Sequence, residues 1–203
     1  MRSLPTLAGE KVILRPFDGS KERARAHQRW RNDSSVMRWH YVRPRTDLSE
    51  ERSRIRRLQD SLDDWAWDIF ASGPDGTWTH VGYVILHLAS RVHRHGELAI
   101  TVGETTFWGR GVGREALALV IDRAFSDEQR LHRVFLNVAA SNERAVRCYR
   151  ALGFVEEGRK REHLLVDDRW EDDLVMSVLD REWSARKAGA AASLRSGGPV
   201  WTT

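Results

Sequence analysis

The sequence predicts an α+β domain built on a mixed, mostly antiparallel β-sheet of about six or seven strands flanked by helices. Segments with strand-like alternation lie on both sides of one strand–helix–strand–helix unit, which spans residues 96–154. Strands joined by short turns pair antiparallel, whereas a helix that crosses between two strands leaves them parallel. The chain has 203 residues, of which 41% are hydrophobic, which is enough for one packed domain but short for two. We therefore expect one domain over residues 1–183 and a mobile tail over residues 184–203, where few positions can form a core.

Local signals place the other elements in order along the chain. Ser20, and Asp47 or Ser49, are suitable N-caps for two amphipathic helices, and the turn-forming residues 72–76 join two strand-like runs into a hairpin. The aromatic-rich segment 36–44 predicts a loop. The expected elements outside the central unit are a strand at 12–15, helices at 20–32 and 47–62, and strands at 65–71, 79–88, 155–166 and 172–179.

The central unit carries a glycine-rich turn between a strand and a helix. Residues 108–116 read W-G-R-G-V-G-R-E-A, and glycines at alternate positions let the backbone adopt positive φ and approach a ligand closely. The helix begins at once; its first N–H groups have no intrahelical partner and lie at the positive end of the helix dipole. Together with Arg110 and Arg114, these donors predict a site for a phosphate-bearing ligand.

A nicotinamide dinucleotide does not fit this turn. Residues 111–116 match the pattern G-x-G-x-x-A, but that motif requires an acidic residue about 20 positions later, at the end of the next strand. Here that strand ends Leu136-Asn137-Val138, without a carboxylate. No series of βαβ units surrounds the motif, so we expect a different phosphate ligand.

The turn and the helix that follows the second strand resemble the acyl-coenzyme A binding core of the GNAT N-acetyltransferase superfamily. In that family the turn reads (Q/R)-x-x-G-x-(G/A), which corresponds to residues 108–113, with Trp108 in place of Gln or Arg. Combined with N-E-R-A-V-R-C-Y-R-A-L-G-F at residues 142–154, the turn most resembles the subgroup of ribosomal-protein N-terminal acetyltransferases. The resemblance spans roughly residues 10–180.

This resemblance implies an enzyme that uses acetyl-coenzyme A as co-substrate and needs no metal. It also implies that the strands beginning at Glu97 and His132 lie parallel and splay apart, leaving a gap for the pantetheine arm. The residues that we expect to contact the coenzyme are Ile100, Thr101, Val102, Arg110, Gly111, Val112, Gly113, Arg114, Asn137, Asn142 and Arg144.

Acetyl transfer to an amine requires a base, because at pH 7 only about one amine in a thousand is unprotonated. Glu97 is the first candidate, since strand alternation places it on the less hydrophobic face of its strand. Its position also matches a glutamate base of some members of the family. A solvated glutamate at a strand edge is an equally compatible interpretation, and Glu104, His163 and Asp68 are weaker candidates for the base.

The leaving thiolate requires a proton or a hydrogen bond. Tyr149 follows Asn142 by seven residues, or two helical turns, and the resemblance assigns it as general acid. A tyrosine of pKa about 10 donates uphill to a thiol of about 8.5, so we expect a hydrogen bond rather than full proton transfer. A core tyrosine is the alternative. Cys148 has no base at a fixed offset and is not expected to act as a nucleophile. A backbone N–H near Thr101 or Val102 would meet the oxyanion.

Tryptophans beside acids predict a site for a cationic acceptor. The chain has nine tryptophans, and we expect the acceptor to contact Asp64, Trp65, Asp68 and Trp170. A small cationic amine such as an aminoglycoside antibiotic fits this set, which would make the chain an antibiotic-resistance enzyme. The N-terminus of a ribosomal protein is the alternative acceptor, and tryptophans in the core are the alternative interpretation. A catalytically silent acyl-coenzyme A binding module remains an alternative of another class.

Composition narrows the other function classes. The formal net charge is +4, and basic and acidic residues are interspersed along the predicted helices, so we expect no direct binding of nucleic acid. One cysteine excludes an internal disulfide and fits a reducing compartment. The beginning of the chain lacks an apolar signal region, and no apolar run is long enough to span a bilayer. We expect a cytoplasmic protein that is not bound to a membrane, with a homodimer as an open alternative.

Overall fold

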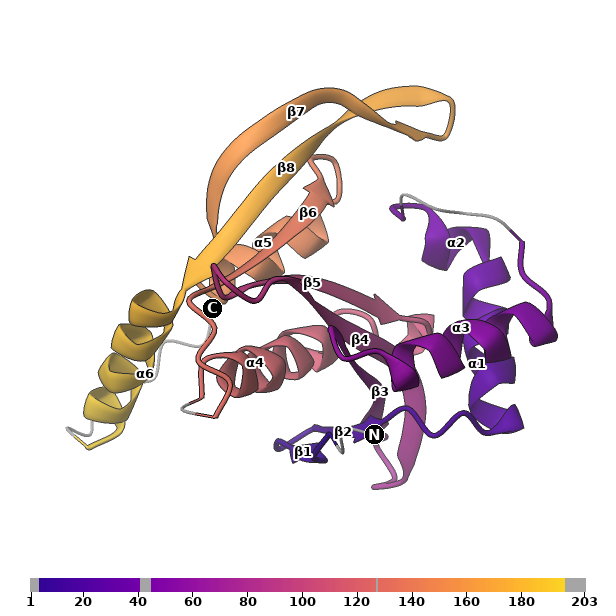
Figure 1. The fold of residues 1–203 in the computed structure, drawn as a ribbon, viewed down its shortest axis with the longest axis horizontal. Helices are drawn as coiled ribbons and strands as arrows, with labels where there is room; N and C mark the ends of the chain where they lie inside the picture. Colours follow the sequence, from indigo (N-terminus) through magenta and orange to yellow (C-terminus); the bar gives the residue numbers. More distant parts are fainter. Residues whose placement is uncertain (1–3, 41–44, 127, 196–203) are drawn as a thin grey trace.

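The computed structural model describes the chain apart from residues 1–3, 41–44, 127 and 196–203. Its centre is one eight-stranded sheet with the strand order β1-β2-β3-β4-β5-β6-β8-β7 (Figure 1). The strands are β1 (Leu7–Ala8), β2 (Val12–Pro16), β3 (Asp64–Ser72), β4 (Trp78–Ser90), β5 (His95–Val102), β6 (Arg133–Ala139), β7 (Val155–Val166) and β8 (Arg169–Leu179). β5 and β6 run parallel, and the other neighbouring strands of the described sheet run antiparallel. The predicted mixed α+β fold is confirmed.

β5 and β6 pair over only the first part of their length. Residues His95–Glu97 pair with Arg133–Phe135, whereas β5 continues to Val102 and β6 to Ala139. Beyond Glu97, β5 stays with β4 while β6 stays with β8, so the two halves of the sheet diverge (Figure 1). This confirms the predicted splayed pair of parallel strands.

Helices cover both faces of the sheet. They are α1 (Lys21–Asn32), α2 (Ser34–Met37), α3 (Leu48–Asp60), α4 (Val112–Ala124), α5 (Glu143–Ala151) and α6 (Asp180–Arg195). In β3, Trp65, Trp67 and Ile69 pack into the larger core with α4, while Ala66 packs into a smaller core with α1 and α3. Because neighbouring side chains of a strand point to opposite faces, α4 lies on one face of β3, and α1 and α3 lie on the other. β3 is therefore buried on both faces.

Both long N-terminal helices begin where the caps predict. The Ser20 hydroxyl accepts a hydrogen bond from the Arg23 N–H at 3.3 Å. Asp47 and Glu50 form a reciprocal capping box at the start of α3, with both hydrogen bonds at 2.9 Å. Leu62, the last residue of the predicted helix at 47–62, instead follows the end of α3 and is 64% exposed.

Three elements differ from the sequence prediction. β1 is an eighth strand of only two residues, too short for an alternation signal. Part of the predicted loop forms α2, whose cap Asp33 accepts a hydrogen bond from the Ser35 N–H at 2.8 Å; residues 41–44 lie outside the described part. The predicted tail continues α6 as far as Arg195 because its run of alanines has high helix propensity. Trp183 anchors this helix: it is 7% exposed, and its Nε1–H donates to Asp122 at 2.7 Å.

Among the helices that the structure describes, none is both long enough and apolar enough to cross a membrane.

Candidate active site

A cleft opens where β5 and β6 separate. Its volume is about 630 Å³, and its walls come from the end of β5, the glycine turn, the start of α4, one side of α5 and the segment around α2. The predicted coenzyme contacts that line it are Ile100, Thr101, Val102, Arg110, Gly111, Val112, Gly113, Arg114, Asn142 and Arg144. Tyr149 lines the cleft too, whereas Asn137 lies outside its lining.

The glycine turn leaves the first donors of α4 open. Gly109 and Gly111 have φ angles of 74° and 83°, in the left-handed region that other residues rarely adopt. Gly111 is the N-cap of α4 and makes no side-chain hydrogen bond to its first turn. The N–H groups of Val112, Gly113 and Arg114 are therefore available to a ligand. A Cβ atom on Gly109 or Gly111 would meet no described protein atom within 4 Å, so both α-carbons face open space.

Trp108 makes two contacts at the first position of the turn. Its indole Nε1–H donates to the Val102 carbonyl at 2.7 Å. The guanidinium carbon of Arg144 lies 4.0 Å from the centroid of its ring. Trp108, which stands where the family has Gln or Arg, thus donates a hydrogen bond to the end of β5 and offers its ring to a cation from α5.

The free edge of β5 supplies backbone groups to the cleft. The Gly103 N–H donates to the Val81 carbonyl of β4 at 2.8 Å. Because N–H groups alternate along a strand, those of Ile100 and Val102 point to the other side, where β6 has separated. The Val102 carbonyl does point there, since it accepts the hydrogen bond from Trp108. These groups can bind an extended ligand that lies in the gap.

The predicted residues of α5 are fixed on one wall. Asn142 is the N-cap of α5, and its Oδ1 accepts a hydrogen bond from the first turn at 3.3 Å. Tyr149 is half-buried, with its ring centroid 5.8 Å from that of Phe154. Burial, with a smaller effect of Cys148, raises the pKa of Tyr149, so its hydroxyl keeps its proton at neutral pH. Burial also raises the pKa of the Cys148 thiol, which disfavours the nucleophilic thiolate.

The cleft contains residues that the sequence analysis did not select. Val36, Trp39 and His40, from α2 and the residues after it, form part of its lining. His40 Nε2 lies 3.4 Å from Thr101 Oγ1. No sequence spacing relates this segment to the glycine turn, and its aromatic-rich composition was the only signal, so the fold alone brings them together.

Glu97 and Asn137 face each other across β5 and β6. Asn137 Nδ2–H donates to Glu97 Oε1 at 3.0 Å, and Lys160 Nζ donates to Asn137 Oδ1 at 2.9 Å. Like Asn137, Glu97 does not line the cleft. Thr101 lies four residues further along β5, about 13 Å at the rise of an extended strand. Glu97 is thus held away from the end of the cleft where Thr101 lies.

The structure does not bring together the four residues predicted to bind the acceptor. Trp65 is 2% exposed in the main core, and Asp68 is 1% exposed under α1. Asp64 Oδ1 lies 2.8 Å from His87 Nδ1 at the start of β3, whereas Trp170 is 64% exposed on β8. None of the four lines the described cleft. The tryptophan–acid pattern of β3 instead reflects a strand buried on both faces.

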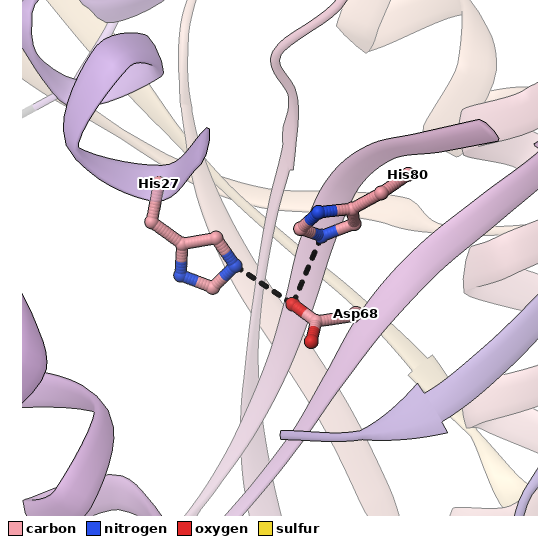
Figure 2. A group of neighbouring side chains, drawn as sticks. All are labelled: His27, Asp68 and His80. Atoms are coloured by element: carbon pink, nitrogen blue, oxygen red, sulfur yellow. Dashed lines mark hydrogen bonds and ion pairs between the residues drawn. The ribbon is translucent and has the colours of Figure 1, made fainter. Parts of the chain in front are cut away.

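Asp68 belongs to a buried polar cluster (Figure 2). His27 Nε2 lies 2.7 Å and His80 Nε2 3.0 Å from the same oxygen, Oδ1. Burial alone raises the pKa of Asp68, but the two histidines lower it overall, so the ionised carboxylate can accept an N–H from each. These residue types can bind a metal, yet Arg23 lies 3.8 Å from Oδ2 and adds positive charge that opposes a cation. We interpret the cluster as a hydrogen-bond network that ties α1 to β3 and β4.

The cleft fits a ligand in which a diphosphate is joined to an extended amide chain. Open N–H groups at the start of α4, flanked by Arg110, Arg114 and Arg144, suit a diphosphate. The free edge of β5 suits the amides of a pantetheine arm. Coenzyme A has both parts.

Known proteins share this sequence pattern. Residues 11–155 match the family model of the acetyltransferase (GNAT) domain. Spermidine N(1)-acetyltransferase of Escherichia coli strain K12 is 27% identical over 179 residues, which cover 88% of this chain and 91% of that protein. The Vibrio cholerae enzyme of the same name is 31% identical over 106 residues, 52% of this chain and 60% of that protein. The [ribosomal protein uS5]-alanine N-acetyltransferase of Escherichia coli strain K12 is 30% identical over 87 residues, 43% of this chain and 44% of that protein.

Solved structures share the fold. The spermidine N-acetyltransferase from Vibrio cholerae in complex with CoA and spermine superposes with a TM-score of 0.76 at 22% identity, covering 87% of this chain and 99% of that one. The sequence matches are shorter: the chain spans 57% and 60% of the length of two of the curated relatives that it matches. Because the family model covers more than half of the chain, this protein belongs to the GNAT acetyltransferase family, whose members use acetyl-coenzyme A.

Proposed function

We propose that this chain transfers the acetyl group of acetyl-coenzyme A directly to a primary amine. The observation that carries the proposal is one cleft that joins the open N-terminus of α4, the free edge of β5 and the hydroxyl-bearing side chain of Tyr149. The thioester is already activated for acyl transfer. The chain therefore has to hold it, direct the amine to it and stabilise the departing sulfur.

Each of these tasks has a candidate group in the cleft. The N–H groups of residues 112–114 hold the diphosphate together with the neighbouring arginines, and Asn142 contacts the coenzyme from the start of α5. The Val102 N–H, on the free edge of β5, donates to the thioester carbonyl. Tyr149 donates a hydrogen bond to the departing sulfur; its raised pKa favours this role over full proton transfer.

Glu97 serves the acceptor rather than the proton transfer in this proposal. Its carboxylate lies on the face of β5 that carries Thr101, but about 13 Å along the strand from that residue. A direct general base must come within about 3 Å of the reacting nitrogen. Because Glu97, held by Asn137, lies outside the cleft lining, we assign it to a cationic group of an acceptor long enough to extend beyond the cleft.

A small cationic amine is the first candidate for the acceptor class. The spermidine acetyltransferase of Escherichia coli aligns over 88% of this chain, and the carboxylate of Glu97 suits a second positive charge. Polyamines and aminoglycosides share this chemistry. The N-terminus of a ribosomal protein is the second candidate, favoured by the relative that acetylates the alanine of uS5.

A thiol-release assay with acetyl-coenzyme A tests the proposal on a panel of spermidine, an aminoglycoside, and peptides with N-terminal alanine or serine. We expect turnover with at least one amine, and Glu97→Gln to raise the KM of a dicationic acceptor while leaving that of a neutral peptide unchanged. If calorimetry shows that coenzyme A binds but no amine of the panel is acetylated, the silent acyl-coenzyme A binding module is favoured.

A further inference from the structure

The imidazole of His40 occupies the part of the cleft next to Thr101. Its Nε2 lies 3.4 Å from Thr101 Oγ1, and both residues line the cleft together with Tyr149 on α5. In Figure 1, α2 and α5 lie on different sides of the opening between β5 and β6. His40 follows α2 and Tyr149 lies on α5, so these two lining residues reach the cleft from different segments of the chain.

Contacts with α2 and with strands β6 and β7 and the β7–β8 turn fix the segment that carries His40. The His40 N–H donates to the Met37 carbonyl at 3.0 Å, which continues the turn of α2. Arg38 pairs with Asp167 at the β7–β8 turn, at 2.7 Å. Trp39 packs against an apolar cluster on the other half of the sheet, formed by Ala139, Leu164 and Val166. These contacts hold the backbone that carries the imidazole, and the contact of Nε2 with Thr101 Oγ1 orients the ring, as proton transfer requires.

Thr101 marks the reacting end of the cleft. It immediately precedes Val102, whose N–H lies on the free edge of β5 and which we assign to the thioester carbonyl. An amine that attacks this carbonyl approaches its carbon from one face of the planar thioester, and the tetrahedral intermediate that forms then expels the sulfur. His40 contacts the residue next to that donor, so its Nε2 is within reach of an attacking nitrogen, directly or through one water.

Other titratable groups are poorly suited to accept a proton there. The remaining titratable side chains that line the described cleft are Lys11, Arg110, Arg114, Arg144, Arg147, Cys148 and Tyr149. The first five are cations at neutral pH, and burial raises the pKa of the last two. Glu104 follows β5, but its carboxylate is engaged by Arg29 and by the indole N–H of Trp30 at 2.9 Å. Glu97 is too distant for direct transfer, as described above.

We propose that His40 is the general base of the acetyl transfer, an inference that rests on the proposed function. Nε2 takes the proton from the acceptor nitrogen as the C–N bond forms. The C–S bond then breaks, and the sulfur takes up a proton from solvent while Tyr149 hydrogen-bonds it. The products are the N-acetylated amine, coenzyme A as the thiol, and His40 protonated, which then releases its proton to water. Thr101 is a positioning residue that orients the imidazole.

The test compares wild type, His40→Gln, His40→Ala and His93→Gln with acetyl-coenzyme A and spermidine, or with the best acceptor of the panel if spermidine is not acetylated. His93 is exposed in the β4–β5 connection and lies outside the cleft, so it is the matched histidine control. The rate is measured from pH 5.5 to 9.5. We expect kcat/KM to fall on the acid side of the profile in wild type and in His93→Gln, because a protonated imidazole cannot act as a base.

Removal of a general base lowers the rate about a hundredfold or more. We therefore expect His40→Gln to lower kcat by that factor and to remove the acid limb from the pH profile of kcat/KM. Added imidazole should restore activity to His40→Ala, where it can fill the space, and not to His40→Gln. Both variants should bind coenzyme A as wild type does in calorimetry, which shows that they fold.

Three results separate the inference from the proposed function. A His40→Gln variant that keeps its rate and its acid limb overturns the inference but leaves acetyl transfer intact. A slow His40→Gln that retains the acid limb, with no imidazole rescue of His40→Ala, also overturns it, because this is the pattern of a structural residue. Wild type that binds coenzyme A but acetylates no amine overturns the proposed function together with the inference.

Discussion

Cys148 and Tyr149 are neighbours on α5 and line the same cleft, and the proposed function assigns only the tyrosine to the leaving group. The raised pKa of Tyr149 keeps its proton in place, so it donates a hydrogen bond but is a weak acid. Such a bond to a charged group contributes about 1.5–3 kcal/mol, and Tyr149→Phe should therefore lower kcat about 10- to 100-fold. Thiol release at saturating acetyl-coenzyme A measures this loss, with coenzyme A affinity as the control. An unchanged kcat would show that Tyr149 is only a core residue.

The buried carboxylate of Glu51, on α3, makes the stability of the fold depend on pH. Burial alone raises the pKa of Glu51, but the nearby His27, hydrogen bonds from Arg54 and the charges of Arg54 and Arg31 lower it from 4.5 to about 2. A carboxyl whose pKa falls on folding stabilises the native state above its unfolded pKa and loses this effect as pH falls through the folded value. This shift corresponds to a free energy on the order of 3 kcal/mol at pH 7.

We therefore expect Glu51→Gln to lower the free energy of unfolding at pH 7 by at least that order. The gap between wild type and variant should narrow as pH falls from 4.5 towards about 2, the range set by the two pKa values. Urea unfolding at pH 7, 5, 4 and 3.5 measures it. Glu22→Gln, at an exposed glutamate in the first turn of α1, is the control. A constant gap across this pH range would contradict the prediction.

Two alanine variants can separate the backbone strain of the turn before α4 from its proposed contact with the ligand. Gly111 and Gly76, in the β3–β4 turn, have φ angles of 83° and 79°, and a Cβ on either would meet no described protein atom within 4 Å. Both alanine variants should thus lose similar stability, about 1 kcal/mol. Only Gly111→Ala places a methyl group beside the open N–H groups of α4. It should weaken coenzyme A binding by about tenfold or more in calorimetry, whereas Gly76→Ala should not. Equal affinities for the two variants would refute the assigned cradle.

Trp108 joins β5, the turn and α5, and its two contacts can be tested apart. Trp108→Phe keeps the ring under Arg144 but loses the N–H to Val102, and Trp108→Leu loses both. If the ring holds Arg144 for a phosphate, Trp108→Leu and Arg144→Gln should be non-additive in coenzyme A affinity, with a coupling of about 0.5–2 kcal/mol. Trp108→Phe and Arg144→Gln should be nearly additive. If the losses of coenzyme A affinity are additive in both double-mutant cycles, Arg144 does not depend on Trp108 to bind the coenzyme.

The elements that the sequence predicted well are those whose cause is local. The caps at Ser20 and Asp47 depend on residues within one helical turn. The positive φ of Gly111 depends only on the glycine, which adopts this conformation without a steric penalty. The burial of Trp65 is different, because it depends on α4, which packs on β3 from a distant part of the sequence. A tryptophan beside an acid looks the same in a strand buried on both faces and in a binding site, so the predicted acceptor set was not supported.

The cleft is assembled from segments that share no sequence pattern. His40 and Thr101 are 61 residues apart, and their contact exists because α2 and β5 reach the same opening from different parts of the sheet. The glycine turn and α5 could be read from the sequence because their spacing is a family motif. The α2 side of the cleft, where we propose that the acceptor binds, could not, since it depends on how the α2 segment meets the β7–β8 hairpin.

The Arg38–Asp167 ion pair joins these two parts. Both side chains are about half exposed, so the pair should contribute little to stability, no more than about 1 kcal/mol. It nevertheless braces the segment that carries Trp39 and His40, so Arg38→Ala should raise the KM of the acceptor several-fold while leaving coenzyme A affinity and unfolding unchanged. Arg91→Ala breaks a similarly exposed pair with Asp63, also at 2.7 Å, away from the cleft, and should change none of these quantities. The charge swap R38D/D167R should recover part of the lost acceptor affinity. If the swap recovers nothing, or if Arg91→Ala has the same effect, the ion pair does not hold the acceptor side of the cleft.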